Sequence, residues 1–367
     1  MTQAWTEADR AFMARALELA RRGLYTTDPN PRVGCVLVRD GKVVGEGWHE
    51  RAGGPHAEVA ALAAAGEAAR GATAYVTLEP CNHHGRTGPC SEALVAAGVA
   101  RVVSAMADPT PVAVGGGARL AAAGVPVATG LMADAAGQLN AGYLRRVRGG
   151  LPWVRVKLAA SLDGRTALAN GESRWITSKA ARTDAQYGRA RSSVVLTGIG
   201  TILADDPAMN VRVPESDRQP LRVILDSRLR TPSDSRVINR EGKVLVVAVS
   251  DDPSRRQSLE RKGVEIAIVP SVDGRPDLNE VLKLLAARGA NEVWVEAGAT
   301  LAGAFVAQGL FDELVIYVAP TLLGPDARAL LALPQLASLE ARPALRFTGS
   351  RVVGDDLCLT ATKAGVS

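Results

Sequence analysis

The chain has 367 residues, of which 47% are hydrophobic but only 4% aromatic, and its formal net charge is +5. This length suffices for two domains, each with its own hydrophobic core. No apolar run reaches the length of a membrane span, and the N-terminus has no charged segment leading into an apolar one, so we expect neither a membrane protein nor a secreted one.

Helices and strands are expected to alternate through the first 106 residues. Thr6 and Asp9 have the spacing of a capping box, and Gly23 is a typical helix stop. Asp40-Gly41, between two alternating segments, predicts a tight hairpin. In chain order we predict a helix after Thr6, strands at 33–39 and 42–48, a helix that begins around His56, a strand at 73–78, a helix at 91–97 and a strand at 101–106. This order favours a mixed sheet covered by helices.

His56, Glu58, Cys81 and Cys90 form the most informative pattern in the chain. One imidazole and two thiolates suit a catalytic zinc ion, which keeps a fourth position for water and lowers the pKa of that water. Glu58 is then free to move protons instead of binding metal. Zinc deaminases share this arrangement, H-x-E followed by P-C-x-x-C, but here eight residues instead of two separate the cysteines. His56 and Cys90 are both expected at helix starts, where thiolate is favoured over thiol.

Other interpretations of these residues remain open at this point. The two cysteines could be inert buried residues that lie near a histidine by chance. His83 and His84 are rival ligands, although their loop position suits substrate contact equally well. A zinc ion closed by one of them as a fourth protein ligand would indicate a structural site, in a binding protein that senses a nucleotide.

A basic stretch with glycine and proline, residues 145–152, is the predicted boundary between domains at 1–150 and 151–367. Beyond it we predict strands at 154–160, 194–197, 221–226, 244–250, 264–269, 292–296 and 314–319, and helices at 178–191, 278–288 and 298–308. This alternation predicts a second α/β domain.

The second half lacks the residues of a His/Cys metal site. No histidine follows His84, and Cys358 is the only cysteine after Cys90. The second domain is therefore either a binding module or an enzyme whose chemistry comes from a cofactor.

Several polar segments of the second half are candidates for ligand binding. The turn at 296–304 leaves a strand and enters a helix with glycines, so it either presents backbone N–H groups to a phosphate or is only a tight turn. Residues 161–165, 171–178 and 204–207 lie beside predicted element ends, where ligand groups concentrate. Arg189 and Arg212 could hold a phosphate or be ordinary surface arginines.

Nearly the whole chain resembles one family, the bifunctional riboflavin-biosynthesis deaminases/reductases. Residues 30–36 (NPRVGCV), 56–59 (HAEV) and 77–87 (TLEPCNHHGRT) are similar to the deaminase half, including the eight-residue spacing of the cysteines. Residues 157–166 (KLAASLDGRT), 175–178 (WITS), 203–207 (LADDP) and 296–298 (EAG) are similar to the reductase half. The resemblance implies a cytidine-deaminase-like mixed sheet with helices, followed by a dihydrofolate-reductase-like α/β domain.

Two successive reactions follow from the resemblance. The first is the hydrolytic deamination of 2,5-diamino-6-(5-phosphoribosylamino)pyrimidin-4-one by hydroxide on zinc, with one zinc ion per chain. The second is the NADPH-dependent reduction of the ribosyl group of 5-amino-6-(5-phosphoribosylamino)uracil to ribityl. The chain would thus be both a hydrolase and an oxidoreductase.

The resemblance also implies roles for particular residues. It makes His56, Cys81 and Cys90 the zinc ligands and Glu58 the catalytic proton shuttle. NADPH contacts are implied at Ala159, Trp175, Thr201, Asp205, Ser227, Gly298, Ala299, Thr300, Leu301, Ala302, Gly303 and Ala304. Substrate contacts are implied at Ser173, Arg189, Met209, Arg212, Glu296 and Lys157.

The chain departs from the family pattern at three places. Gly88 stands where a second proline is usual, Ala60 replaces a common histidine, and residues 114–117 (VGGG) are looser than the usual turn. None of these changes removes a zinc ligand or Glu58, so they bear on loop rigidity more than on activity.

A base deaminase of the tRNA-editing type, with an RNA-binding second domain, is the rival enzyme class. Such proteins depend on aromatic stacking and basic grooves, and 4% aromatics with a charge of +5 argue against it. We therefore expect a phosphorylated pyrimidine as the partner molecule, no nucleic acid, no membrane, and a homo-oligomer, either dimer or tetramer. Four cysteines do not form a disulfide framework in a chain this long, which favours a cytoplasmic location.

Overall fold

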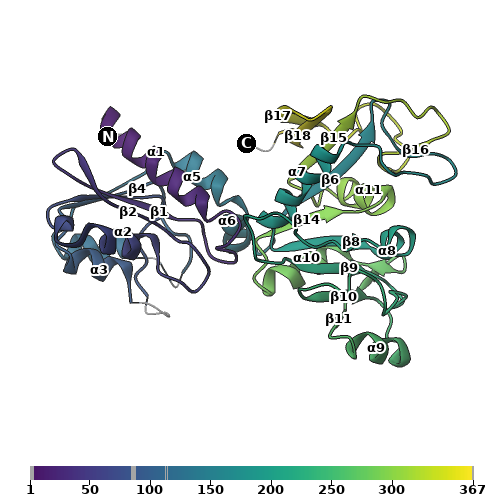
Figure 1. Ribbon diagram of the computed structural model, residues 1–367, viewed down its shortest axis with the longest axis horizontal. Coiled ribbons are helices and arrows are strands. Elements are labelled where there is room, and N and C mark those ends of the chain that lie inside the picture. The colour runs from purple at the N-terminus through teal and green to yellow at the C-terminus, as the bar shows by residue number, and fades with distance from the viewer. Residues whose placement is uncertain (1–3, 84–87, 112, 114, 366–367) are drawn as a thin grey trace. The chain divides into compact units, whose positions relative to one another are not determined.

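Two units make up the structure, Met1–Gly150 and Leu151–Ser367, here called the N-terminal and C-terminal units. The computed structural model describes residues 4–83, 88–111, 113 and 115–365 (Figure 1). Each unit has its own mixed sheet with helices, which confirms the predicted fold class. In the part of the chain that is described, none of the helices combines the length and the apolar character that a membrane span would need.

The N-terminal unit is built on a five-stranded sheet with the order β2-β1-β3-β4-β5. Its strands are β1 (Gly34–Arg39), β2 (Lys42–Trp48), β3 (Thr73–Val76), β4 (Arg101–Ser104) and β5 (Val127–Thr129). Its helices are α1 (Glu7–Arg22), α2 (Ala57–Ala65), the 3-10 helix η1 (Gly66–Ala69), α3 (Cys90–Ala96), α4 (Gly116–Ala122), α5 (Ala133–Leu139) and α6 (Ala141–Gly149). Strand β1 is antiparallel to both of its neighbours, whereas β3, β4 and β5 are parallel.

Helices cover both faces of this sheet because successive side chains of a strand point to opposite sides. Val36 and Val38 of β1 share a buried cluster with α1, α5 and α6. Cys35 and Leu37, which alternate with them, belong to a second cluster with α2, α3 and α4. The zinc-ligand candidates therefore lie on the α2–α3 side of a closed three-layer core.

Two features of this unit were predicted correctly from local sequence signals. The Thr6 side chain accepts from the Asp9 N–H and the Asp9 carboxylate accepts from the Thr6 N–H, so the predicted capping box is confirmed. The hairpin at Asp40-Gly41 is confirmed too, with φ angles of 53° and 73° at the two turn residues. The basic stretch is different from our expectation, because Arg145, Arg146 and Arg148 lie on helix α6 instead of in a linker.

A nine-stranded sheet forms the C-terminal unit, with the order β11-β10-β9-β8-β14-β6-β15-β18-β17. Its strands are β6 (Trp153–Ser161), β8 (Val194–Gly198), β9 (Leu221–Leu225), β10 (Val244–Ala248), β11 (Glu265–Ile268), β14 (Glu292–Glu296), β15 (Glu313–Ala319), β17 (Leu345–Val353) and β18 (Asp356–Lys363). The short strands β7 (Arg165–Ala167), β12 (Ser271–Val272), β13 (Arg275–Pro276) and β16 (Arg328–Ala329) form two small ribbons. The helices are α7 (Lys179–Arg191), α8 (Ile199–Asp205), α9 (Pro253–Glu260), α10 (Leu278–Ala287) and α11 (Ala299–Ala307).

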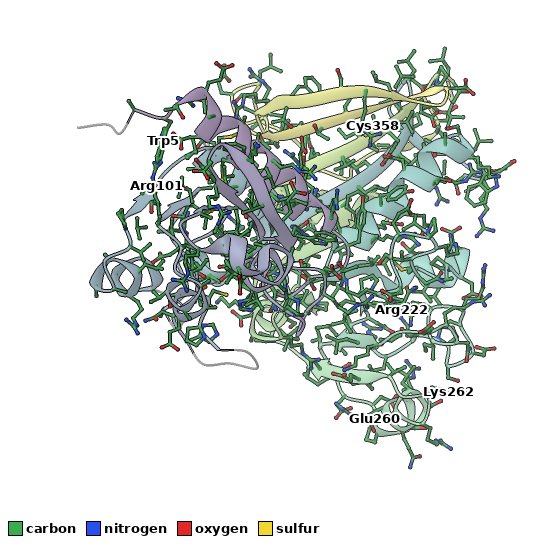
Figure 2. The ribbon with its side chains drawn as sticks, turned by 60° about the vertical axis from the view of Figure 1, so that its left-hand side comes forward. Trp5, Arg101, Arg222, Glu260, Lys262 and Cys358 are labelled. Carbon is green, nitrogen blue, oxygen red and sulfur yellow. The ribbon has the colours of Figure 1, made fainter. Side chains whose placement is uncertain are left out.

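Seven strands of this sheet are parallel, and the C-terminal hairpin β17–β18 extends it antiparallel. Helices α10 and α11 pack on one face, and α7 and α9 pack on the other. Arg222 of β9, which is labelled in Figure 2, is one of several buried charged residues of this unit. It is 1% exposed. The hairpin was not predicted, because eight of the nine residues of β17 are exposed and show no alternation that marks a buried face.

Candidate active sites

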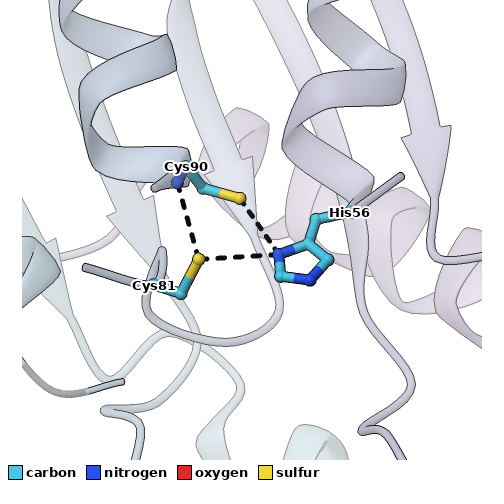
Figure 3. Close-up of side chains that lie close together, drawn as sticks. All are labelled: His56, Cys81 and Cys90. Atoms are coloured by element: carbon cyan, nitrogen blue, oxygen red, sulfur yellow. Dashed lines mark hydrogen bonds between the residues drawn. The ribbon is translucent and has the colours of Figure 1, made fainter. Parts of the chain in front are cut away.

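His56, Cys81 and Cys90 come together in the N-terminal unit from three separate segments (Figure 3). His56 is the N-cap of α2, and Cys90 is the first residue of α3. Cys81 lies in the loop that follows β3. His56 and Cys90 lie where a helix begins and Cys81 follows a strand, so the three side chains are held by backbone that the sheet and helices fix.

The spacing of these side chains matches the donor set of a tetrahedral zinc ion. His56 Nδ1 lies 3.2 Å from Cys90 Sγ and 3.5 Å from Cys81 Sγ. Zn–S and Zn–N bonds of about 2.3 Å and about 2.0 Å separate such donors by about 3.5 Å at a tetrahedral centre. Both cysteines are buried and neither forms a disulfide. The residues present therefore fit zinc, with His56 binding through Nδ1.

Protonation within this cluster favours metal binding. A hydrogen bond from Cys90 lowers the pKa of the Cys81 thiol to about 4, so Cys81 is thiolate at neutral pH. The same interaction, together with burial, raises the pKa of Cys90, because two thiolates this close repel each other. A divalent cation removes that repulsion, so binding of zinc releases the remaining proton.

Glu58 lies in the first turn of α2 and is 3% exposed. Burial raises the pKa of its carboxyl to about 7, and the nearby Cys81 thiolate acts in the same direction. A carboxyl group with such a pKa can both take and give a proton near neutrality. It is not one of the three residues of the metal cluster.

His49 lies beside the cluster, and the sequence analysis did not name it as a site residue. The His49 ring lies edge-on to that of His56, with centroids 5.5 Å apart. Its Nδ1 contacts the carbonyl oxygen of Pro55 at 2.9 Å and its Nε2 contacts the Asn30 side-chain nitrogen at 3.1 Å. His49 thus holds the loop before His56, but no sequence motif marks it as a partner.

The rival fourth ligands do not join this cluster among the described residues. His83 is outside the group of donor atoms that lie within 4.8 Å of one another, and its Nδ1 is buried without a hydrogen-bond partner. His84 lies outside the described residues. The loosened segment 114–117 still requires glycine at 116, because a Cβ there would be 1.7 Å from the Pro80 carbonyl oxygen, beside Cys81.

The C-terminal unit contains a cleft of about 1730 Å³. Its lining includes the carboxyl ends of the parallel strands β6, β8, β9 and β14 and the segments that follow them. Ligands of open α/β sheets bind at this edge. A typical small-molecule pocket is about 300–1,000 Å³, so this cleft has room for two ligands.

Nearly all the residues that we expected to bind ligands in this half line that one cleft. They are Lys157, Ala159, Ser173, Trp175, Arg189, Thr201, Asp205, Met209, Arg212, Ser227, Glu296, Gly298, Ala299, Thr300, Leu301 and Ala304. The structure does not place Ala302 and Gly303 there. Both are buried in α11, where Gly303 packs so tightly that a Cβ would be 2.3 Å from the Ala332 carbonyl oxygen.

Lys157, Arg189 and Glu296 form a charged group at the floor of the cleft. Both Glu296 carboxylate oxygens accept hydrogen bonds from Arg189 at 2.6 Å. Burial alone would raise the pKa of Glu296, but Arg189 and Lys157 lower it to about 2. Burial lowers the pKa of Lys157, against the effect of Glu296. The guanidinium group of Arg189 therefore already forms a bidentate pair with the Glu296 carboxylate.

Sequence reasoning missed most of the cationic lining of the cleft. Arg174, Arg182, Arg230, Arg236, Arg240, Arg275 and Arg328 also line it. They come from five separate parts of the chain: the segment before α7, helix α7, the segment between β9 and β10, strand β13 and strand β16. Only Arg174 lies in a segment that the sequence analysis had named for ligand binding, residues 171–178, so only the fold brings the group together. Arg182 lies over the Trp175 ring, 4.3 Å from its centroid.

Two family descriptions match the chain, one on each unit. Residues 6–106 match the cytidine and deoxycytidylate deaminase zinc-binding region, and residues 152–359 match the RibD C-terminal domain. The first match, together with the His/Cys cluster, confirms the prediction of a zinc site. The individual ligands and contact residues stay predictions.

Full-length relatives resemble the chain from end to end. It is 51% identical to the riboflavin biosynthesis protein RibD of Escherichia coli, over 96% of this chain and 98% of that protein. It is 47% identical to the RibD protein of Haemophilus influenzae, over 99% of both chains.

Solved structures agree with this similarity. RibD of Acinetobacter baumannii superposes with a TM-score of 0.91 at 44% identity, over 98% of this chain and 99% of that one. A Thermotoga maritima protein described as a diaminohydroxyphosphoribosylaminopyrimidine deaminase/5-amino-6-(5-phosphoribosylamino)uracil reductase superposes with a TM-score of 0.86 at 31% identity, over 97% and 99%.

Proposed function

The chain belongs to the RibD family of bifunctional deaminases/reductases of riboflavin biosynthesis, and from this premise we propose which molecules it acts on and which residues act. It deaminates 2,5-diamino-6-(5-phosphoribosylamino)pyrimidin-4-one in the N-terminal unit. It then reduces the ribosyl group of 5-amino-6-(5-phosphoribosylamino)uracil to ribityl in the C-terminal unit. The observation that carries this proposal is that one chain holds both a zinc-type His/Cys cluster and a two-ligand cleft.

Glu58 performs the proton transfers of the deamination. His56, Cys81 and Cys90 would hold the zinc ion, which would supply an acidified water as the nucleophile. The buried carboxylate of Glu58 takes a proton from the nucleophile side and gives one to the departing amino group, which leaves as ammonia. Its raised pKa suits both steps, because a group that ionises near the working pH exchanges protons in either direction.

The reduction uses a hydride from NADPH, and the cleft fits such a cofactor. Gly298 caps α11 without a side-chain hydrogen bond, and Ala299 and Thr300 line the cleft beside it. The free N–H groups of this helix start suit a cofactor phosphate. Trp175 is 69% exposed on the cleft wall and offers a flat surface for a ring.

Lys157 and Glu296 face the reacting end of the substrate in this proposal. Glu296 orients Arg189 through two hydrogen bonds, and Lys157 lies in the same buried group. No histidine is present in this half of the chain, so the proton that follows the hydride comes from this group or from water.

Separate assays of the two half-reactions test the proposal. Purified protein is given the phosphoribosylamino-pyrimidine, and ammonia release and NADPH oxidation are followed independently. We expect ammonia release without NADPH, and NADPH oxidation only with deaminated substrate. NADPH oxidation with the diamino substrate in a protein stripped of zinc would contradict the assigned order.

We also propose that the chain forms a homo-oligomer, dimer or tetramer, in the cytoplasm. Strand β17 is an end strand of its sheet, and Phe347 and Val352 on it are 70% and 75% exposed. Unprotected edges of this kind readily pair with another strand. Phe347→Lys is expected to shift the mass measured by light scattering towards the monomer. All four cysteines are free, as a reducing compartment requires.

A further inference from the structure

Three arginines of the cleft have no carboxylate partner. Arg212, Arg236 and Arg240 line it, and no carboxylate oxygen of the described residues lies within ion-pair distance of their guanidinium groups. The one side-chain bond of Arg212 is to the neutral Asn210 amide oxygen, at 2.7 Å. All three side chains are exposed to the cleft.

Their positive charges act on one another. Burial lowers the pKa of Arg212, and the charges of Arg189, Arg236 and Arg240 lower it further. Glu296 is the opposing charge, but both of its oxygens already accept from Arg189. A group of like charges without a counter-charge is unfavourable by itself and favours an anion.

Three other arginines of the cleft do have a carboxylate partner. Arg189 is held by Glu296, and Arg174 is paired with Asp205 at 3.3 Å. Arg230 lies 4.0 Å from the Asp226 carboxylate. Arg182, Arg275 and Arg328 also line the cleft without an ion pair among the described residues, and Arg182 is held by the Thr177 carbonyl oxygen and the Trp175 ring. Arg212, Arg236 and Arg240 are set apart because their positive charges lie close enough to act on one another.

The backbone that carries the unpaired arginines is anchored. The Arg236 N–H donates to the Asp206 carboxylate at 2.7 Å, which ties it to the loop that leads to Arg212. Arg222, buried in the sheet (Figure 2), donates through Nη2 to the carbonyl oxygens of Arg240, Glu241 and Gly242 at 2.9, 2.9 and 2.6 Å. Anchored segments lose less entropy when a ligand binds, so these guanidinium groups are preorganised.

We propose that Arg236 and Arg240, together with Arg212, bind a phosphate monoester in the cleft. The planar guanidinium fork matches phosphate oxygens, and the three positive charges more than offset the two negative charges of a phosphate monoester dianion. The inference rests on the proposed function, which brings two such groups to the cleft: the phosphate of the ribosyl substrate and the 2′-phosphate of NADPH. Arg189, which is committed to Glu296, is a positioning residue in this assignment and not a phosphate ligand.

Calorimetric binding to the full-length protein tests the inference without any turnover. Ribose 5-phosphate represents the substrate, adenosine 2′-phosphate represents the cofactor, and ribose and adenosine are the controls that lack phosphate. We expect Arg236→Gln and Arg240→Gln each to weaken one phosphorylated probe by about tenfold to a hundredfold, the range for a lost hydrogen bond to a charged group. The probe that is affected identifies the source of the phosphate.

Arg256→Gln on α9 is the matched control, because it removes one positive charge outside the cleft lining. It should bind both probes within twofold of the unaltered protein. Arg236→Lys should weaken binding less than Arg236→Gln, since it keeps the charge and loses only the fork. The melting temperature of each variant, compared with that of the unaltered protein, shows whether the C-terminal unit is folded.

Kinetics give a second readout. The KM of the affected ligand should rise in the Gln variants, with kcat within about threefold, because uniform binding is removed. The inference is overturned if both variants bind both probes within twofold of the unaltered protein. An enzyme that binds the probes through these arginines but never oxidises NADPH would instead refute the proposed function alone.

Discussion

The zinc cluster and the cleft present two ways of building an active site. The cluster uses three donor atoms within 4.8 Å of one another, supplied by His56, Cys81 and Cys90. The cleft has a volume of about 1730 Å³ and draws on the ends of four strands and the loops between them. Deamination is therefore expected to fail when one atom is removed, whereas the reduction should decline in steps.

Charge is arranged differently in the two sites as well. In the cluster, the two neighbouring thiols share one proton, and this arrangement favours the binding of a cation. In the cleft, unpaired arginines outnumber the unpaired carboxylates, so the lining favours the binding of an anion. The first site is specified by metal chemistry, and the second by the shape and charge of two organic ligands.

Cys90→Ser should have the largest effect. Removing one of the three protein ligands lowers the zinc content from about one per chain to near zero and abolishes deamination, because the metal has no replacement ligand. Metal analysis with the ammonia assay measures both. Cys35→Ala, which alters a buried cysteine outside the metal cluster, should retain the zinc. Full zinc in Cys90→Ser would show that the ligand set is wrong.

Glu58→Gln should separate metal binding from proton transfer. The amide keeps the shape of the side chain but cannot take up and release a proton near neutral pH, so we expect unchanged zinc and deamination reduced by about 10²–10⁴-fold. Reduction of substrate that is already deaminated should be unaffected. The exposed Glu92 of α3 gives a control, and Glu92→Gln should deaminate normally. A loss below about tenfold would remove Glu58 from its role.

Glu296→Gln should have a smaller effect, divided between activity and stability. It leaves Arg189 and Lys157 without their negative partner, which we expect to slow NADPH oxidation at least about tenfold. Breaking a buried pair in this way costs about 3–5 kcal/mol, and the 12% and 16% exposure of the two side chains places it at the lower end. Glu280→Gln, which breaks a surface pair with Lys283, should change neither activity nor melting.

The stability effect of Glu296 should depend on pH. Its pKa falls from an ordinary value of 4.5 to about 2 on folding, so the stabilisation is present above pH 4.5 and is lost as the pH falls towards 2. Melting of Glu296→Gln should therefore differ from that of the unaltered protein at pH 7 and approach it in acid. An equal difference at both pH values would mean that the ion pair is not its cause.

Sequence and structure agree best where the signal is local. The capping box at Thr6, the turn at Asp40-Gly41 and the helix start at His56 each depend on a few adjacent residues, and each was predicted correctly. The exposed strand β17 and the helix that carries Arg145 were missed, because the first has no buried face and the second has the composition of a linker.

The same reasoning explains what could be predicted of the two sites. A metal cluster requires rare residue types, so four positions in the sequence indicated it. The unpaired arginines of the cleft belong to a residue type that is common on surfaces, and the carboxylates that pair with the others lie up to 107 residues away, as for Arg189 and Glu296. Only the structure shows that Arg236 and Arg240 have no carboxylate partner in the described part of the chain, whereas arginines such as Arg174 do.

The smallest effect on NADPH oxidation is expected when the N-terminal unit, with its metal cluster, is removed from the chain. All the residues that line the cleft, and the whole nine-stranded sheet, lie in Leu151–Ser367. A fragment of these residues should therefore fold and oxidise NADPH with deaminated substrate at close to the full-length rate. Since it contains no histidine and Cys358 as its single cysteine, a chelator should not affect it. The full-length protein under the same chelator is the control, and it should lose deamination only. Inhibition of the fragment by the chelator would contradict the assignment of the metal to one site and of NADPH to the other.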